Sequence, residues 1–434
     1  MKFKYFFLFI ISSVSLFAQI DDFKLDAYFD VLEENDKFNG SVAVAQDGEI
    51  IYQRAIGFAD YEAQRKNNPE TLFRIGSISK TYTATMIMMA VEEGKINTEQ
   101  TIADYFPTIK NADKITIDQL LSHRSGIKNF TSDPDYLNWN THAKSEKEMI
   151  EIIAGYDSNF EPGTTFEYSN SNYLLLSFLL EKIYKKSFSE ILNEKIIQPL
   201  HLKKTKFERK IKPTDNEAYS YQYNGEWVKS TETDMLIPMG AGGLSATPTD
   251  VILFGEALFN GKIVSPESLE KMKTLRDAYG YALFYFPFYE KEGLGHTGGI
   301  DNFSSSWVYF EEDKISVAIT SNASDFNMNN LTIALLSAAF AKEFDLPIFE
   351  QSTGEVTPGY TGKFGNGQLG MKIEITETDG NYFAQASGQG AFPLEKISET
   401  EFRFDLAGIV IEFNPDLKSF ILKQGGGEFI FVKE

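Results

Sequence analysis

Apolar and polar positions alternate near the start of the chain and then give way to long apolar runs. The segments SVAVA and EIIYQRAI flank Asp47-Gly48, a pattern that predicts a β-hairpin over Phe38 to Phe58. Thr81 to Glu93 and Tyr173 to Ile183 are strongly apolar, which predicts two buried helices. The first half of the chain therefore combines an early hairpin with a mainly helical region.

The second half of the pattern adds a helix start, two strands and a closing helix. The segment Thr247-Pro248-Thr249-Asp250 is typical of a helix start, with a threonine cap and a proline in the first turn. Strands are predicted over Phe303 to Phe310 and Lys314 to Thr320, and a helix from about Asn327 to Phe340. This order of elements indicates an α+β fold, with an antiparallel sheet flanked by helices.

The last part of the chain follows a different pattern. Residues 346–358 are polar and loop-like, and residues 359–434 resemble short strands separated by glycine turns. We therefore predict a main domain over residues 19–345, a linker over 346–358 and a small all-β domain of barrel or sandwich type over 359–434. For that last domain we expect a packing role rather than a share in the chemistry.

The first residues have the order of a secretory signal peptide. Lys2 and Lys4 supply positive charge, an apolar run follows from Phe6 to Leu16, and Ala18 is a small residue at a plausible cleavage point. A membrane-spanning helix needs roughly 20 apolar residues, and this run is shorter. We therefore predict that residues 1–18 are a signal peptide and that the mature protein is periplasmic or secreted, without stable membrane insertion.

Composition narrows the possible chemistry. The chain has no cysteine, which excludes disulfides, thiol nucleophiles and zinc–thiolate sites. Its four histidines form no HExxH-like cluster, so we expect no metal and no cofactor. A net charge of −21 argues against nucleic acid as a partner. A small-molecule or peptide substrate is left as the expected partner, and the oligomeric state stays open.

A serine and a lysine lie three positions apart in the segment FRIGSISK. Ser77 follows a glycine and opens a helical stretch, so Lys80 is expected on the same helix face. A buried lysine with a lowered pKa can remove the proton of a serine hydroxyl, which makes the serine a nucleophile. The same spacing occurs at Ser125 to Lys128 and at Ser268 to Lys271, which we interpret as solvent-exposed matches without a role.

Two later segments carry complementary chemistry. Tyr168 and Asn170 lie in a YSN sequence before the predicted apolar helix, where a phenol can relay protons and an amide can bind a substrate amide. His296-Thr297-Gly298-Gly299 precedes the predicted Phe303 strand, and its glycines would let a substrate lie against a strand edge. The backbone N–H groups of Gly299 and Ser77 are candidates for an oxyanion hole.

The order S-x-x-K, Y-x-N, H-T-G resembles that of the class C β-lactamase and D-alanyl-D-alanine carboxypeptidase family, which shares its fold with penicillin-binding proteins. The resemblance runs from about Phe38 to Phe340 and includes the segments LLSHRSGI and GAGGLSATPTD. It implies a β-lactamase/transpeptidase-like fold. The predicted C-terminal β domain also resembles the barrel-like module that many members of this family carry.

The resemblance implies roles for individual residues. Ser77 would form an acyl-enzyme, and Lys80 and Tyr168 would share the acid and base work. Asn170 would hold the substrate amide, and Thr297 would help to hold a carboxylate or an oxyanion. His296 stands where many members have lysine, and a histidine is charged only partly at neutral pH. His123 of LLSHRSGI lies near a predicted helix end that Gly126 closes, and we interpret this residue as structural.

The sequence therefore predicts an exported serine hydrolase that acts on a D-amino-acid peptide, an ester or amide, or a β-lactam. The histidine at position 296 favours a carboxypeptidase-like or esterase-like enzyme over an efficient β-lactamase. One alternative is a catalytically silent member that binds peptidoglycan-like ligands in the same cleft. Another is a β-domain adhesion or sensor protein with a vestigial first domain. Both would be marked by a lost nucleophile, lysine or tyrosine, and all three residues are present.

Overall fold

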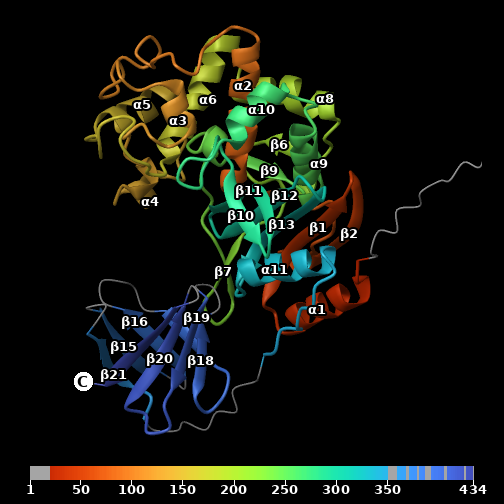
Figure 1. The fold of residues 1–434 in the computed structure, drawn as a ribbon, viewed down its shortest axis with the longest axis vertical. Helices are drawn as coiled ribbons and strands as arrows, with labels where there is room; N and C mark the ends of the chain where they lie inside the picture. The colour runs from red at the N-terminus through yellow and green to blue at the C-terminus, as the bar shows by residue number, and fades with distance from the viewer. Residues whose placement is uncertain are drawn as a thin grey trace, which may run out of the picture.

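The computed structural model describes residues 20–349, 359–367, 371–378, 381–386, 392–404, 408–424 and 427–433 (Figure 1). The predicted signal peptide lies outside these residues, as does most of the predicted linker. Within the described part of the chain, no helix has the length and apolar composition needed to cross a bilayer.

A six-stranded antiparallel sheet forms the centre of the first region. Its strand order is β10-β11-β12-β13-β1-β2, so strands from both ends of the region pair side by side, as the sequence predicts. The hairpin turn at Asp47 and Gly48 has positive φ at both residues, which suits a tight two-residue turn. The strands are β1 (Phe38–Gln46), β2 (Glu49–Ile56), β10 (Phe284–Phe288), β11 (Lys291–Ile300), β12 (Phe303–Phe310) and β13 (Ile315–Ser324).

Each face of this sheet buries a different core. Along β1, Val42 belongs to the core beneath α1 (Asp22–Glu34) and α11 (Met328–Ala339), whereas its neighbour Ala43 belongs to the core beneath α9 (Pro248–Phe259). Successive side chains of a strand point to opposite faces, so a strand buried on both faces is apolar at consecutive positions. Figure 1 shows α1 and α11 together on one face of the sheet.

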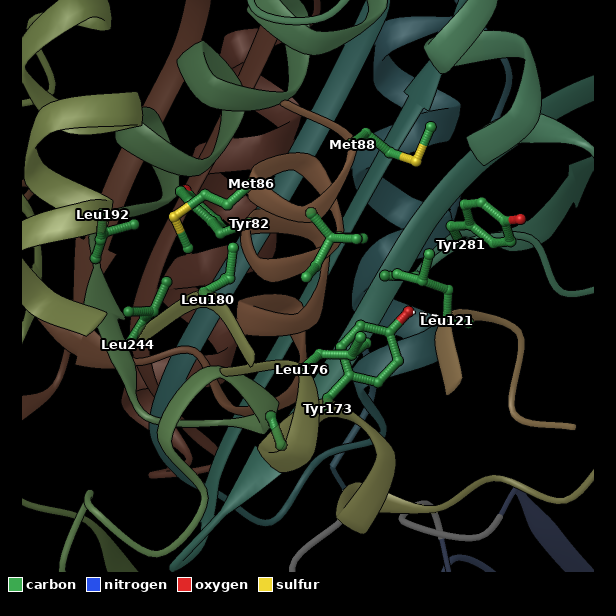
Figure 2. Close-up of a cluster of buried hydrophobic side chains, with 14 of the residues drawn as sticks. Tyr82, Met86, Met88, Leu121, Tyr173, Leu176, Leu180, Leu192, Leu244 and Tyr281 are labelled. Carbon is green, nitrogen blue, oxygen red and sulfur yellow. Dashed lines mark hydrogen bonds between the residues drawn. The ribbon is translucent and has the colours of Figure 1, made fainter. Parts of the chain in front are cut away.

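Two largely apolar helices fill the core that lies beneath α9. In α2 (Ser79–Glu92) most side chains are fully buried, and α6 (Asn170–Tyr184) is buried along most of its length. Figure 2 shows side chains of both helices, Tyr82 and Tyr173 among them, in one apolar cluster. The helices thus match the two apolar runs, and this packing fixes the position of the α2 N-terminus.

Shorter elements complete the first region. Thr247 caps α9 by accepting a 3.2 Å hydrogen bond from the N–H of Asp250, as predicted. The remaining helices are α3 (Ile117–Leu121), α4 (Tyr136–Trp139), α5 (Glu146–Ala154), α7 (Phe188–Leu192), α8 (Gln198–Leu200) and α10 (Pro266–Lys273). The short strands are β3 (Phe58–Asp60), β4 (Arg65–Lys66), β5 (Phe73–Arg74), β6 (Thr205–Phe207), β7 (Tyr221–Tyr223), β8 (Trp227–Lys229) and β9 (Leu244–Ala246).

The C-terminal strands form a closed antiparallel barrel, which decides between the two predicted types. Pairing of the first strand with the last closes it, and its interior is rich in phenylalanine and tyrosine. A closed barrel has no free strand edges. Its strands are β14 (Gly362–Asn366), β15 (Met371–Thr378), β16 (Asn381–Ala386), β17 (Phe392–Lys396), β18 (Glu401–Phe404), β19 (Ile409–Phe413), β20 (Ser419–Gln424) and β21 (Gly427–Lys433).

Candidate active site

Ser77 lies in a tight turn between β5 and α2, directly against strand β11. The turn is a 3-10 segment, Gly76–Ile78, that runs into α2. Gly76 has φ of +48°, and a Cβ at this position would lie 2.6 Å from the backbone nitrogen of Gly299. Both the backbone conformation and the space therefore require glycine before the serine. The close approach brings the start of the helix and the strand into backbone contact.

Lys80 lies one turn further on and is completely buried. Its Nζ is 2.8 Å from Ser77 Oγ, 2.7 Å from Asn170 Oδ1 and 2.6 Å from the carbonyl oxygen of Ala241. Burial lowers the pKa of this amine well below its ordinary value. A neutral amine has two N–H donors and one lone pair. The two carbonyl oxygens can take both donors, which leaves the lone pair for the hydroxyl of Ser77.

The YSN segment faces the same lysine from the start of α6. Asn170 is held at both ends, because its Oδ1 accepts from Lys80 and its Nδ2 donates to Thr131 Oγ1 at 3.1 Å. The ring of Tyr168 lies with its centroid 4.9 Å from Lys80 Nζ. Burial raises the pKa of the Tyr168 hydroxyl well above its ordinary value, and a hydrogen bond with Ser77 opposes that shift. Burial therefore favours the neutral form of both groups, the protonated phenol and the neutral amine.

His296 lies on β11, in the second half of the strand rather than at the strand start that the sequence suggested. Its Nδ1 is 2.5 Å from the carbonyl oxygen of Thr297, which can only accept, so Nδ1 carries the proton. Its Nε2 is buried and has no hydrogen-bond partner among the described residues. Burial, followed by the charge of Lys80, lowers the pKa of His296 to about 3. The imidazole is therefore neutral near pH 7.

The H-T-G motif therefore does not place its histidine side chain where the sequence analysis expected it to bind substrate. The side chain of His296 is only 1% exposed and does not line the cleft beside Ser77, whereas the Thr297 side chain is exposed. A buried neutral imidazole offers no positive charge to a substrate carboxylate. The structure therefore does not bring His296 to the surface where a carboxylate would lie.

The backbone segments that carry the two predicted oxyanion-hole donors lie next to each other beside Ser77. A Cβ on Gly298 would lie 2.9 Å from the backbone nitrogen of Ser77 and 2.1 Å from the carbonyl oxygen of Ile75. The hydroxyl of Ser305 donates to the same Ile75 oxygen at 2.8 Å and ties β12 to the turn. Gly299 follows on β11 and lines the cleft together with Ser77. The two predicted N–H donors therefore lie on neighbouring segments of one wall.

The cleft that these groups share has a volume of about 580 Å³, and both polar and apolar groups form its walls. It is far larger than one alanyl group, so it offers room for further parts of a substrate. Its lining residues come from α4, the start of α6, the β7–β8 hairpin, and the loops around Thr233, Ala241 and Asp301. They are Ser77, Thr131, Tyr136, Leu137, Asn140, Asn170, Gln222, Val228, Lys229, Ser230, Thr231, Thr233, Pro238, Ala241, Gly242, Gly299, Ile300, Asp301 and Asn302.

The sequence missed several contributors to this site. The Ala241 carbonyl that holds Lys80 belongs to the GAGG segment, which carried resemblance but no assigned role. The other two S-x-x-K serines, Ser125 and Ser268, are buried, so their interpretation as solvent-exposed was wrong. Ser125 donates to Asn172 at 2.6 Å inside the core, whereas Ser268 lies in the first turn of α10. Neither lines the cleft.

A family model described as β-lactamase matches residues 25–341, the region that holds all of these groups. The chain belongs to the β-lactamase family. This region contains every strand of the six-stranded sheet and ends just after α11. Family membership places the protein among the serine hydrolases. Among the residues that the structure describes, no group of three or more histidine or acidic side chains is arranged to hold a metal ion.

Curated relatives include two proteins of bacterial origin. The chain is 26% identical to penicillin-binding protein 4* of Bacillus subtilis, over 93% of this chain and 97% of that protein. It is 29% identical to the teichoic acid D-alanine hydrolase of Staphylococcus aureus, over 70% of this chain and 74% of that protein. The first similarity extends into the barrel.

Solved structures show the same division between the two regions. A D-amino acid amidase from Ochrobactrum anthropi SV3, complexed with L-phenylalanine amide, has a TM-score of 0.65 at 26% identity and covers 73% of this chain and 98% of that one. A penicillin-binding protein homologue from Pyrococcus abyssi has a TM-score of 0.67 at 23% identity and covers 95% of this chain and 100% of that one. The second match establishes the fold of nearly the whole chain.

Proposed function

We propose that the protein is an exported hydrolase that forms an acyl-enzyme at Ser77 and acts on D-amino-acid amides or D-alanyl esters. The observation that carries the proposal is the set of three contacts around Lys80, which suits a neutral amine with its lone pair directed at Ser77 Oγ. The similarity to a D-amino acid amidase and to a teichoic acid D-alanine hydrolase supports the substrate class.

The proposed acylation step uses two groups whose pKa values are shifted in opposite directions. Lys80 accepts the proton of Ser77 as Oγ attacks the substrate carbonyl, since burial lowers the pKa of the amine. Tyr168 donates its proton to the leaving nitrogen or oxygen, since burial keeps the phenol protonated. The proton on Lys80 then restores the phenol. The backbone N–H groups of Ser77 and Gly299 bind the negative oxygen of the intermediate.

Deacylation completes the reaction with water as the second acyl acceptor. The neutral Lys80 takes a proton from water as the water oxygen attacks the acyl carbon. It then passes that proton to Ser77 Oγ as the bond between Oγ and the acyl carbon breaks and the free acid leaves. Asn170, anchored by Lys80 and Thr131, keeps its amide at the cleft wall, where it can bond to the substrate amide. Thr297, exposed one residue before the glycines, is proposed to assist on the strand side.

The neutral state of His296 supports amides and esters over anionic substrates. A free carboxylate or a penicillin carboxylate meets no cation from the strand side of the cleft, because His296 is buried and uncharged. An amide or ester of a D-amino acid carries no carboxylate beside the scissile bond. We therefore expect slow acylation by penicillins and faster turnover of D-alanine p-nitroanilide or D-alanine methyl ester.

The proposal is tested with the mature protein and the Ser77→Ala variant. The substrates are the D and L forms of alanine p-nitroanilide, and a fluorescent penicillin serves as the labelling probe. The proposal is supported if the wild type turns over the D form selectively and Ser77→Ala lowers this turnover by about 10⁴-fold or more. Removal of the nucleophile alone abolishes nearly all covalent catalysis. Saturable binding of the probe without turnover in either protein would instead support the silent binder. Turnover of only the L form would reject the substrate class.

Export is proposed from the order of charge, apolar run and small residue over positions 1–18. The test is expression of the full chain in a bacterial host, followed by cell fractionation and mass measurement of the recovered protein. A periplasmic or secreted product that begins near Gln19 is expected. A full-length product in the cytosolic fraction would contradict export while leaving the proposed reaction untouched.

A further inference from the structure

His123 lies directly behind the proposed acid Tyr168. It follows helix α3 with φ of +56° and is completely buried. The ring centroids of His123 and Tyr168 are 4.3 Å apart, and the ring planes are tilted by 37°. The two residues come from segments 45 positions apart in the chain, which the fold brings into contact.

Both nitrogens of His123 have fixed partners. Its Nδ1 accepts from the backbone N–H of Ser169 at 3.2 Å and lies 3.1 Å from the Nδ2 amide of Asn172. A nitrogen that accepts a backbone N–H carries no proton, so the proton lies on Nε2. That N–H donates to the hydroxyl of Tyr279 at 3.1 Å. These partners therefore fix His123 in the tautomer that carries its proton on Nε2.

Burial favours the neutral form of the ring. It lowers the pKa of His123 well below its ordinary value, and any positive charge on Lys80, His296 or Arg124 acts in the same direction. An imidazolium would place an N–H against the N–H of Ser169. The lowered pKa of His123 therefore favours the neutral form that accepts from Ser169.

Contacts with other segments hold the start of α6. Ser169 is the N-cap residue of α6, but its side chain makes no capping hydrogen bond, and its buried Oγ has no partner among the described residues. Helix starts ordinarily rely on such caps. Here Asn129 Oδ1 accepts from the N–H of Asn170 at 3.1 Å, and His123 accepts from the N–H of Ser169, the residue between Tyr168 and Asn170.

We propose that His123 is a positioning residue for the acyl-transfer step, which goes beyond the structural part expected from the sequence. Its ring supports the Tyr168 ring and its Nδ1 holds the Ser169 backbone, so the phenol stays at Ser77 and Asn170 stays at Lys80. His123 touches no group that lines the cleft except through these neighbours. This inference rests on the proposed function, because it assigns a second residue to the same reaction.

The first test compares His123→Phe with His123→Asn. Phenylalanine keeps a ring but loses the acceptor, whereas the asparagine oxygen lies the same number of bonds from the backbone as Nδ1 and tolerates positive φ. We expect His123→Phe to lower kcat for D-alanine p-nitroanilide about 30-fold or more with KM within about threefold, as for a misplaced catalytic group. His123→Asn should recover most of that loss. Equal losses in both variants would overturn the role of the acceptor.

The chain offers a matched control in His201. This histidine is exposed and also has positive φ, 54°, so His201→Phe reproduces the chemical change and the backbone cost away from the cleft. Its kcat should equal that of the wild type. If His123→Phe changes kcat no more than His201→Phe does, the positioning proposal is wrong.

The second test asks whether His123 acts through Tyr168. In a Tyr168→Phe background, His123→Phe should cost clearly less than it does in the wild type, because the hydroxyl that the ring positions is gone and only the anchoring of Asn170 is left to lose. An undiminished cost in that background would overturn the proposal. If the His123 variants do not fold, Tyr279→Phe removes only the acceptor of Nε2–H and should lower kcat several-fold with the same dependence on Tyr168. An unchanged kcat there would also overturn it.

These outcomes separate the two proposals. Wild-type turnover that depends on Ser77, together with His123 variants that behave like the His201 control, rejects only the positioning role. A wild type without Ser77-dependent turnover rejects the proposed function, and the positioning role falls with it.

Discussion

The helix side and the strand side of the cleft are built differently. On the helix side, the Lys80 amine has three partners within 2.8 Å and is held between Ser77, Asn170 and Ala241. On the strand side, His296 bonds only to the adjacent Thr297 carbonyl, and its Nε2 has no partner among the described residues. Both side chains are buried, and burial lowers the pKa of both.

The difference separates the chemical step from recognition of charge. A neutral lysine beside Ser77 is a base, so burial on the helix side creates reactivity. A neutral histidine on the strand side has no charge with which to hold an anion, so burial there removes a binding contribution. Changes on the helix side should therefore act mainly on kcat. Changes on the strand side should alter which substrates are accepted.

The largest effect is expected for Lys80→Met. The variant keeps the length and apolar stem of the side chain but has no amine, and we expect kcat for D-alanine p-nitroanilide to fall by about 10³-fold or more. The free energy of unfolding of Lys80→Met should, in contrast, be higher than that of the wild type. Because burial lowers the pKa of Lys80 in the folded chain, binding a proton there favours the unfolded chain, so folding is penalised at pH values below the ordinary lysine pKa. Methionine removes this penalty.

Urea unfolding at pH 7, followed by tryptophan fluorescence, tests the stability half of this prediction. All three tryptophans, Trp139, Trp227 and Trp307, precede the barrel, so the signal reports on the first region alone. The midpoint of Lys80→Met should be higher than that of the wild type, and the gap should narrow as the pH is raised toward 10. A lower midpoint at every pH would show that the amine is not a destabilising buried base.

The strand side is tied to the helix side by a buried ion pair, and breaking it should have the next largest effect. Asp301, in the turn after Gly299, accepts from Arg74 at 2.9 Å, and both side chains are at most 6% exposed. Asp301→Asn leaves the buried arginine with less compensation, although Glu232 still contacts it at 2.7 Å. We expect a loss of about 3 kcal/mol in the free energy of unfolding.

An exposed turn of the same sheet supplies the control for this loss. Asp47 pairs with Lys314 at 2.7 Å, and both side chains are more than half exposed. Asp47→Asn should cost less than about 1 kcal/mol in the same tryptophan-monitored unfolding experiment. Similar costs for Asp47→Asn and Asp301→Asn would mean that the pair with Arg74 does not hold the two sides of the cleft together.

Local patterns in the sequence predicted most of the framework. The β1–β2 hairpin, helices α2 and α6 and the cap of α9 follow from turn residues, apolar runs and a capping threonine, which depend on neighbouring positions only. Strand β11 was not predicted, because KEGLGHTGGI is rich in glycine and has only two β-branched residues, Thr297 and Ile300. The strand is held by pairing with β10 and β12, which no local pattern shows.

The sequence was enough to predict which residues form the site, but not how they are arranged in space. Ser77, Lys80 and Tyr168 can be named from the order of their motifs, yet the Ala241 carbonyl lies 161 residues from Lys80. The same limit applies to His123, whose contact with Tyr168 depends on tertiary packing. Likewise, the composition of HTGG suggests a partly charged histidine at the cleft, whereas packing of β11 buries the ring. Long-range burial therefore decides the charge state that the motif leaves open.

The smallest effect, and the sharpest test of the two-sided comparison, is expected for His296→Lys. A lysine reaches further than an imidazole and restores a cation to the strand side, which should speed acylation by an anionic penicillin about tenfold. D-alanine p-nitroanilide, which has no carboxylate, should gain nothing. His142→Lys adds the same charge at an exposed position and should leave both rates unchanged. If His296→Lys changes the ratio of the two rates by less than about twofold, then the uncharged strand side does not set the preference, and other groups of the cleft wall do so instead.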